Sequence, residues 1–285
     1  MFSIETLTAV PYLNKDNCNS IPIPLPSLPE QRSISQALSD VDRLIAALDK
    51  AIDKKRAIKT ATMQQLLTGK KRLPGFGEGK GDQQTEVGVI PEDWKVCTLG
   101  DAVDFLDGKR KPIKESNRAK MHGIYPYYGA SGIVDYVNNY LFNEDLILLG
   151  EGGENILSRS VRLAFSVSGK IWVNNHAHVL KPKLDFDIGF LTEYLESLDY
   201  SLYNSGTAQP KLNQQTCQSI PITQPSQEEQ QEIATVISDM DAEIAALETR
   251  LAKTQSVKQG MMQQLLTGKV RLKIKADMDA GREDD

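Results

Sequence analysis

The chain has 285 residues, a formal net charge of -5 and a sequence pI of about 5.4. This length accommodates an ordinary domain beside a long helical element, and the acidic balance does not indicate a polycationic nucleic-acid binder. No apolar run is long enough for a membrane helix, no signal-peptide pattern is present, and the three cysteines lack metal-site spacing; a reduced, cytoplasmic setting is therefore expected.

Residues 1–20 are interpreted as the remnant of a first, largely absent domain. The reason is an internal repeat: residues 8–73 match residues 207–272 at a constant offset of 199 (207 minus 8), with 34 of 66 positions identical. The stretch before Ser219 in the second copy closes a folded segment, and its counterpart before Ser20 has no such segment in front of it. Cys18 and Cys217 share a repeat position, which favours small buried side chains over a disulfide.

Each repeat continues with a proline-rich connector and a long predicted helix. The alternating prolines of Ile21–Pro29 exclude a central strand and favour an extended lead-in. Ser27 with Glu30, and again Ser226 with Glu229, fit the capping-box pattern of a helix start. Residues 21–73 and 221–272 are therefore each predicted to hold a lead-in and a helix of about 40 residues, roughly 60 Å long.

Both predicted helices carry an apolar seam with heptad spacing. Its members are Ile34, Leu38, Val41, Ile45, Leu48 and Ile52 in the first copy, and Ile233, Ile237, Met240, Ile244, Leu247 and Leu251 in the second. Lys55 and Thr254 interrupt the seam, and Ile58 and Val257 are expected to continue it after a stutter. Gly69 and Gly268 are placed to end the helices. We expect an antiparallel coiled-coil rod within one chain; the alternative is pairing of each helix with its twin in another chain.

The region between the helices is predicted to contain a linker and a compact domain. Glycines at every second position from Gly75 to Gly81 indicate a linker over residues 74–92, and the domain spans residues 93–220. Short strands are predicted at residues 95–99, 133–137, 146–149, 161–166 and 170–173, and an amphipathic helix at residues 188–198. The predicted fold class is α+β with a mostly antiparallel sheet, followed by a charged, disordered tail over residues 273–285.

Signals for catalysis are weak. The segment Gly150–Glu154 has two carboxylates where a phosphate-binding loop needs neutral or basic surroundings, so it is interpreted as a tight turn. The acid-x-Lys triplets Asp107–Lys109 and Glu78–Lys80 are common by chance. His176 and His178 would face one side of a strand, but no third metal ligand follows at a usual interval. No catalytic residue, metal site or cofactor is therefore assigned to this chain.

A basic run is the strongest binding signal in the domain. It consists of Lys109, Arg110, Lys111, Lys114, Arg118 and Lys120, and Glu115 is the single acidic residue among them. Aromatic and polar side chains able to contact DNA follow it. The candidate DNA-binding set therefore adds Asn117, Tyr125, Tyr127, Tyr128, Ser131, Asn174, Asn175, His176, His178, Gln209 and Lys211. The alternatives are a solvated loop for the basic run and a role in holding the fold for the residues from Asn174 onward.

Several motifs together resemble the specificity (S) subunit of type I restriction-modification systems. They are the Pro-x-x-x-Glu-Gln lead-ins at residues 26–31 and 225–230, the Gln-Gln-Leu-Leu-Thr-Gly-Lys helix ends, Ile-Pro-Glu-Asp-Trp at residues 90–94, and segments 127–132, 175–180 and 205–212. The resemblance implies a non-catalytic subunit whose target recognition domain reads half of a bipartite site in double-stranded DNA. It also implies that the helices dock methyltransferase subunits and, through them, the restriction subunit. S-adenosylmethionine, ATP and Mg would belong to those partners.

The sequence departs from this family because only one recognition domain, residues 93–220, is evident. We expect either a homodimer, with two identical readers and a palindromic split site, or a single domain that reads one half-site. This region has 13 basic and 15 acidic side chains, so weak binding with a shallow salt dependence is expected for the chain alone. The alternative function is a helical scaffold or adaptor without DNA sequence preference; an intrinsic nuclease or methyltransferase would need a catalytic set that the sequence does not show.

Overall fold

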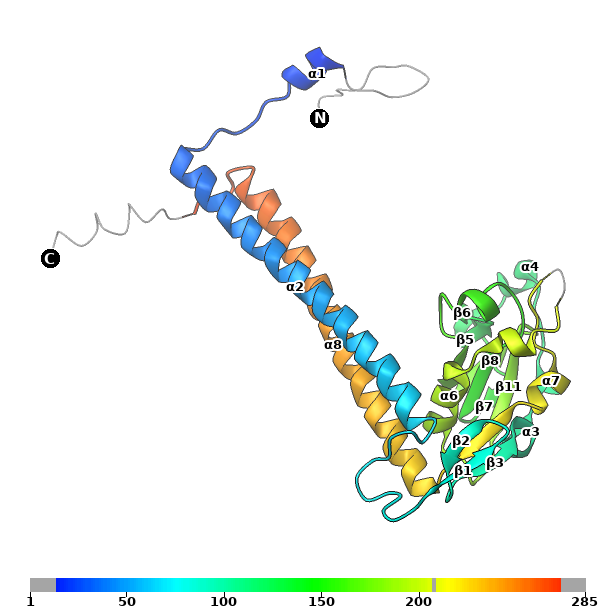
Figure 1. The fold of residues 1–285 in the computed structure, drawn as a ribbon. Helices are drawn as coiled ribbons and strands as arrows, with labels where there is room; N and C mark the ends of the chain where they lie inside the picture. The colour runs from blue at the N-terminus through cyan, green and yellow to red at the C-terminus, as the bar shows by residue number, and fades with distance from the viewer. Residues whose placement is uncertain (1–13, 207–208, 273–285) are drawn as a thin grey trace. The chain divides into compact units, whose positions relative to one another are not determined.

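The computed structural model describes residues 14–206 and 209–272, and the chain divides into two compact units. The first unit comprises residues up to Lys54 and from Ile244 onward, and the second comprises Lys55–Glu243. Two helices of 39 residues each, α2 (Leu28–Leu66) and α8 (Gln227–Leu265), contribute to both units (Figure 1). The short helix α1 (Lys15–Asn19) belongs to the first unit. Most of the predicted domain remnant and all of the predicted tail lie outside the described residues.

Ion pairs between α2 and α8 show that the two helices run antiparallel within each unit. In the first unit, Lys258 Nζ lies 2.5 Å from Asp42 Oδ1. In the second unit, Lys59 Nζ lies 2.6 Å from Asp241 Oδ2. Asp42 and Lys258 are the repeat counterparts of Asp241 and Lys59, so the duplicated sequence makes each contact twice. The predicted antiparallel pairing within one chain is confirmed.

The residues of the apolar seam are buried or half-buried where its heptad spacing is regular. Ile34, Leu48 and Ile52 of α2 are at most 6% exposed. The prediction that Ile58 and Val257 continue the seam is wrong, because they are 40% and 50% exposed. Polar contacts replace the seam where the spacing slips, and Lys55 Nζ lies 2.6 Å from Glu243 Oε1.

The helix ends follow the sequence signals only in part. Gly69 and Gly268 have φ angles of 71° and 72°, the left-handed conformation predicted for a helix C-cap. Ser226 Oγ accepts a hydrogen bond from Glu229 N at 3.3 Å, which is half of a capping box. The predicted reciprocal half is wrong, because the Glu229 carboxylate binds Arg72 instead.

The start of each long helix is tied to the segment that follows the other long helix. Arg72 Nε donates to Glu229 Oε1 at 2.6 Å, and its repeat counterpart Arg271 Nε donates to Glu30 Oε1 at 2.5 Å. In the second unit, Trp94 Nε1 also donates to Glu229 Oε2 at 2.9 Å, and the Arg72 guanidinium lies 5.5 Å from the Trp94 ring centroid. Both glutamates are nearly inaccessible to solvent, so each must be neutralised by its arginine.

The second unit contains four small sheets, which confirms the α+β class (Figure 1). One has the order β6 (Gly132–Val137), β5 (His122–Gly129), β10 (Lys170–Val173) and β7 (Phe142–Asn143), and another has the order β4 (Val103–Phe105), β11 (Ala177–Pro182), β8 (Leu146–Gly150) and β9 (Ala164–Val167). The two-stranded sheets pair β1 (Asp82–Thr85) with β2 (Gly88–Pro91), and β12 (Pro221–Gln224) with β3 (Lys95–Thr98). Every pairing is antiparallel except that of β10 with β5.

Short helices connect these strands. They are α3 (Leu99–Ala102), η1 (Asp107–Lys109), α4 (Glu115–Arg118), α5 (Asn155–Ser158), α6 (Ile188–Ser197), η2 (Tyr200–Tyr203) and α7 (Gln214–Gln218). The largest apolar core joins β8, β11 and α6 to Trp94 and to the end of α2 at Leu66 and Leu67. The predicted linker over residues 74–92 contains the hairpin β1–β2, so it is partly ordered; the domain boundary itself stays a prediction.

Candidate DNA interface

Four loops of the second unit meet beyond the ends of its strands. They are the β5–β6 turn (residues 129–132), the end of β8 (150–153), the β10–β11 turn (174–176) and the segments 205–206 and 209–211, and we call them the loop cluster. Backbone hydrogen bonds join them: Glu151 N donates to His176 O at 2.9 Å, Gly153 N to Pro210 O at 3.0 Å, and Asn174 N to Tyr128 O at 3.0 Å. The ladders of both four-stranded sheets therefore hold these loops in place.

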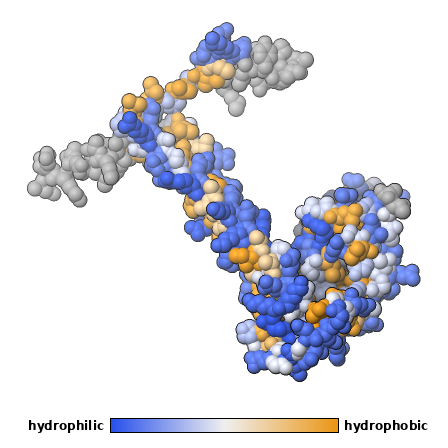
Figure 2. All heavy atoms as spheres, viewed as in Figure 1, coloured by the Kyte–Doolittle hydropathy of each residue, from blue (hydrophilic) through white to orange (hydrophobic). Residues whose placement is uncertain are grey.

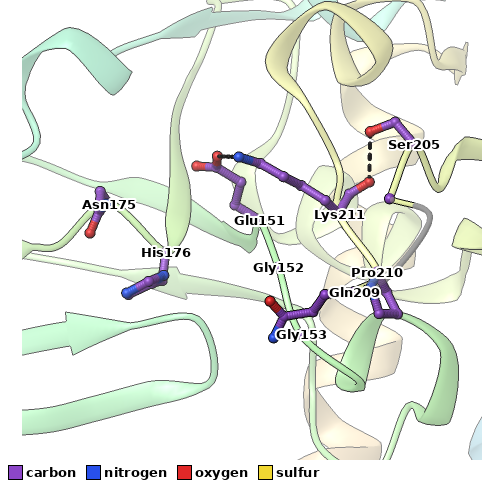
Figure 3. Close-up of a pocket in the computed structure, with 10 residues that line it drawn as sticks. Glu151, Gly152, Gly153, Asn175, His176, Ser205, Gln209, Pro210 and Lys211 are labelled. Atoms are coloured by element: carbon purple, nitrogen blue, oxygen red, sulfur yellow. Dashed lines mark hydrogen bonds and ion pairs between the residues drawn. The ribbon is translucent and has the colours of Figure 1, made fainter.

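The loop cluster encloses a pocket of about 440 Å³ (Figure 3). Asn175 and His176 lie on one side of it, and Gln209, Pro210 and Lys211 lie on the other. The remaining lining residues are Glu151, Gly152, Gly153, Ser205 and Gly206. Four candidates that are far apart in the sequence, Asn175, His176, Gln209 and Lys211, are thus brought together with exposed side chains.

Glu151 is the acidic residue of this pocket, and two cations balance it. Arg110 Nη1 donates to Glu151 Oε2 at 2.6 Å, and Lys211 Nζ lies 3.5 Å from Glu151 Oε1 (Figure 3). Arg110 also donates to Ala177 O at 2.7 Å and is 13% exposed. Its guanidinium therefore anchors the basic run to the loop cluster and is not available to a phosphate.

The lysines of the basic run have their charges available, and Lys111 lies beside the loop cluster. Lys111 N donates to Val173 O at 3.2 Å, and Trp172 Nε1 donates to Lys111 O at 2.6 Å, so the run follows the end of β10. Lys109, Lys111, Lys114 and Lys120 are exposed, and none has an ion-pair partner among the described residues. Four positive charges without an ion-pair partner among the described residues therefore lie along residues 109–120, and that of Lys111 is next to the β10–β11 turn.

Three predicted DNA contacts are instead part of the core. Tyr127, Asn174 and His178 are 2%, 8% and 1% exposed, so their side chains cannot reach a duplex. The Tyr127 hydroxyl accepts a hydrogen bond from Ile113 N at 3.0 Å. Asn174 Oδ1 accepts one from His176 N at 2.8 Å and shapes the β10–β11 turn.

The expectation that the two histidines face one side of a strand is wrong. His176 lies in the turn before β11, which begins at Ala177, so the alternation of a strand does not include it. His178 points into the core, where its Nδ1 lies 2.6 Å from Asp107 Oδ2 and its Nε2 lies 3.0 Å from Leu212 O. Both ring nitrogens face acceptors, an arrangement that favours the doubly protonated imidazolium.

The electrostatic environment of His178 agrees with that geometry. Burial by itself lowers the pKa of His178, but the hydrogen bonds and charges of Asp107 and Cys217 outweigh it and raise the pKa to about 10. Asp107 Oδ1 also accepts from Val179 N at 2.9 Å. The acid-x-Lys triplet at Asp107 is thus a structural brace between η1 and β11.

The remaining candidates differ in how accessible they are. Arg118 pairs with Asp135 at 3.0 Å and lies 5.0 Å from the Tyr127 ring centroid, so it braces β6 against β5. Tyr125 and Tyr128 are half-buried, whereas Asn117 and Ser131 are exposed. Gly152, Gly153, Ser205 and Pro210 line the pocket although no sequence signal assigned them a binding role; the glycine-rich turn at residue 150 marks the two glycines, and the family motif of residues 205–212 contains Ser205 and Pro210.

Within the described ranges, no group of three or more His, Cys, Asp or Glu residues is arranged to hold a metal ion. None of the described helices is long and apolar enough to cross a membrane.

The fold and the site define a class: a small α+β domain that presents a polar, lysine-bordered loop cluster, attached to two long antiparallel helices. The chain belongs to the family described as the type I restriction modification DNA specificity domain, whose model matches residues 3–56 and 91–257. The sequence resemblance is thereby confirmed.

Relatives with known names are specificity subunits. The chain is 29% identical over 295 residues to the type I restriction enzyme MjaVIII specificity subunit of Methanocaldococcus jannaschii, covering 93% of this chain and 66% of that protein. It is 34% identical over 151 residues to a putative type I restriction enzyme specificity subunit of Haemophilus influenzae, covering 53% and 37%. The chain therefore spans less than two thirds of the length of these relatives. They are named as specificity subunits, in agreement with the prediction that this chain is a specificity subunit and not an enzyme.

Solved structures show the same fold. The crystal structure of a type I restriction-modification S subunit from M. genitalium matches with a TM-score of 0.62 at 17% identity, covering 92% of this chain and 68% of that one. The HsdS subunit from Thermoanaerobacter tengcongensis matches with a TM-score of 0.53 at 17% identity, covering 92% and 64%.

Proposed function

We propose that the chain is a DNA sequence-recognition subunit of a type I restriction-modification complex, and that the loop cluster contacts one half of a bipartite site. Membership of the specificity family supports DNA sequence recognition in general. The observation that carries the assignment to this surface is the meeting of Asn175, His176, Gln209 and Lys211 at one pocket beside unpaired lysines.

The two groups of residues have different roles in this proposal. The lysines of the basic run neutralise phosphates, which adds affinity without sequence preference. The amides of Asn175 and Gln209 and the imidazole of His176 offer the donors and acceptors that distinguish base pairs in the major groove. Arg110 joins the basic run to Glu151 at the pocket, so both groups of residues are held in one rigid frame.

The test begins with the recognised sequence, obtained by co-expressing the chain with its cognate modification and restriction subunits and mapping the methylated adenines. Binding of that duplex is then compared for Lys109→Ala/Lys111→Ala and for the control Lys181→Ala/Lys183→Ala, which removes the same charge from exposed residues outside the loop cluster. The first variant is expected to weaken binding to all duplexes and to reduce the salt slope by about two. The control should bind as the parent chain does.

A second pair of variants tests recognition of the base sequence separately from electrostatic attraction to phosphates. Asn175→Ala/Gln209→Ala is expected to narrow the gap between cognate and non-cognate duplexes by about 1–3 kcal/mol per lost base contact. Ser168→Ala is an exposed control between β9 and β10 and away from the pocket. Wild-type binding by both the lysine and the amide variants would remove the loop cluster from the interface.

The long helices are the proposed dock for methyltransferase subunits. They expose apolar side chains that the helix pair does not use: Leu44, Ile58, Val257 and Met262 are between 40% and 50% exposed. Leu44→Asp and Val257→Asp are expected to reduce co-purification of the methyltransferase subunits while leaving DNA binding by the chain intact. Capture of those subunits without any preference for a DNA sequence would favour the alternative, a helical adaptor.

A further inference from the structure

Two apolar side chains adjoin the loop cluster, and the roles given above to lysines, amides and an imidazole do not involve them. Ile133 and Val134 directly follow the β5–β6 turn, and they are 47% and 56% exposed. On the face drawn in Figure 2, the surface of the second unit is mostly hydrophilic, with separate hydrophobic patches. Exposed apolar residues that stand singly are common, but these two are adjacent. A ligand of the loop cluster would therefore meet an apolar as well as a polar surface.

A β-bulge in β6 exposes both side chains. Tyr128 lies opposite Ile133, and Tyr127 lies opposite Asp135. Val134 is therefore an extra residue without a partner on β5. Consecutive side chains of a regular strand point to opposite faces of the sheet, and a bulge breaks this alternation and redirects a side chain. Because β6 is also the edge of its sheet, the exposure of the pair follows from the backbone of the hairpin.

Val134 is held close to the turn that carries Asn175 and His176. A Cβ atom at Gly129 would lie 2.7 Å from Val134 Cγ2 and 3.5 Å from Asn174 Nδ2. The valine thus lies over the glycine backbone and near Asn174, whose Oδ1 accepts a hydrogen bond from His176 N at 2.8 Å. The apolar pair therefore has a fixed position next to side chains that are proposed to contact bases.

The neighbouring charge favours a nucleic acid over an apolar protein surface as the ligand of this pair. Lys111 N donates to Val173 O at 3.2 Å, one residue before Asn174, and the lysine side chain is exposed. A duplex offers phosphates to such a cation and apolar methyl groups in its major groove to the pair. An apolar protein surface would instead desolvate the cation without giving it a partner.

We propose that Ile133 and Val134 contact the C5-methyl group of a thymine in the recognised half-site, an inference that rests on the proposed function of the loop cluster. In the major groove this methyl group is a feature that thymine has and cytosine lacks. β-branched side chains have few rotamers, so the pair loses little conformational entropy on contact. The amides of Asn175 and Gln209 suit adenine, so the two kinds of contact together favour A·T over G·C pairs.

Uracil tests the methyl group by itself, because it keeps the hydrogen-bonding atoms of thymine and lacks only the methyl. Once the recognised sequence is mapped, each thymine of the half-site is replaced in turn by uracil, and binding by the full chain is measured. Thymine lies opposite every methylated adenine, so the comparison is always possible. At one or two positions the parent chain is expected to bind about fourfold more weakly, the effect of losing one buried methyl group.

Substitutions then assign the effect to the two side chains. Ile133→Ala/Val134→Ala is expected to bind the thymine and uracil duplexes within about twofold of each other. Val134→Thr keeps the branched shape over Gly129 and replaces one methyl with a hydroxyl, so it should reduce the preference as well. The control Val89→Ala removes the same atoms from a valine of β2 that is also 56% exposed, and it should keep the full preference.

Two results would overturn the proposal. One is a parent chain that recognises its sequence but binds the thymine and uracil duplexes equally at every position. The other is a thymine preference that survives in Ile133→Ala/Val134→Ala; loss of methyltransferase subunits by that variant would then identify the pair as a protein contact. Both results leave the proposed function standing, because recognition through Asn175 and Gln209 is measured separately. A chain without any preference for the mapped sequence would remove the proposed function and this inference with it.

Discussion

His178 holds the second unit together through charge, although its sequence neighbours suggested a role at the surface. Its imidazolium joins Asp107 of η1 to the carbonyl of Leu212, beside the pocket loop. With the pKa raised from 6.5 to about 10 in the folded chain, this contribution to stability is complete below pH 6.5. It is lost progressively as the pH rises from 6.5 through about 10, because the unfolded chain releases the proton first.

We therefore predict that the free energy of unfolding falls between pH 7 and pH 10, and that His178→Gln removes most of this decline. Urea unfolding at several pH values measures this change in the free energy of unfolding. His176→Gln is the matched control, since that side chain is exposed and lies two residues away. NMR should show the His178 ring protonated at neutral pH; a neutral ring at pH 7 would contradict the assignment.

The glutamates that begin the two long helices offer a second comparison of single residues. Glu229 is enclosed by Arg72 and Trp94, and Arg72 has an exposed fraction of 16%. Its counterpart Glu30 binds Arg271, whose side chain is 72% exposed. Burial makes the loss of a charged partner costly, whereas solvent compensates an exposed one.

Glu229→Gln is therefore predicted to lower the free energy of unfolding by about 2 kcal/mol or more. Glu30→Gln, the same change at the equivalent repeat position, should have a clearly smaller effect. Thermal or urea unfolding of the two variants measures the difference. Equal losses would mean that Arg271 is covered as completely as Arg72 in solution.

At the scale of elements, substitutions on α2 distinguish the effect of side-chain packing on stability from the effect of helix propensity. Leu48 is 5% exposed, and Leu44, one turn earlier on the same helix, is 41% exposed. Leu48→Asp buries an unpaired charge and is predicted to cost about 3 kcal/mol or more, and Ile45→Asp, also in the seam, should destabilise in the same direction. Leu44→Asp should change stability little. If Leu44→Asp were as damaging as Leu48→Asp, the observed face of α2 would be wrong.

The sequence is most informative about elements whose contacts are periodic and local. The seams and cap glycines predict α2 and α8 well, and the strands predicted at residues 95–99, 146–149 and 170–173 correspond to β3, β8 and β10. The missed strands β5 and β11 contain Pro126 and His178, residues that do not look like strand interiors. Long-range partners fix them, β10 for β5 and β8 for β11.

The candidate interface was predictable in composition but not in burial. Sequence proximity groups Arg110 with Lys109 and Lys111, yet Glu151, which is 41 residues away, draws the arginine inward. Tyr127 is withdrawn in a similar way by Ile113 and Arg118. Such assignments depend on which side chain meets a buried partner across the fold, and no spacing rule contains that information.

For the whole molecule, net charge is a poor guide to the local surface. Several carboxylates of the domain are used in internal pairs: Glu193 lies 3.7 Å from Lys59 Nζ and also binds Arg162, and Glu196 pairs with Arg159 at 3.0 Å. The lysines of the basic run have no such partners among the residues described. A chain with a net charge of -5 can therefore present a positive patch.

The size of that patch limits how strongly salt can affect DNA binding. Its members are Lys109, Lys111, Lys114 and Lys120. Lys211, which also faces Glu151, is counted with them to give an upper limit, and each lysine contributes at most one phosphate contact. At about -0.9 per contact, the slope of log K against log salt for the free chain should be no steeper than about -4.5. Because the rest of the chain is acidic, we expect a shallower value for the chain alone and a steeper one when partner subunits add their own cations. Titration of the cognate duplex at several salt concentrations measures both slopes. A free-chain slope well beyond -4.5 would require phosphate contacts from cations outside the loop cluster and the basic run.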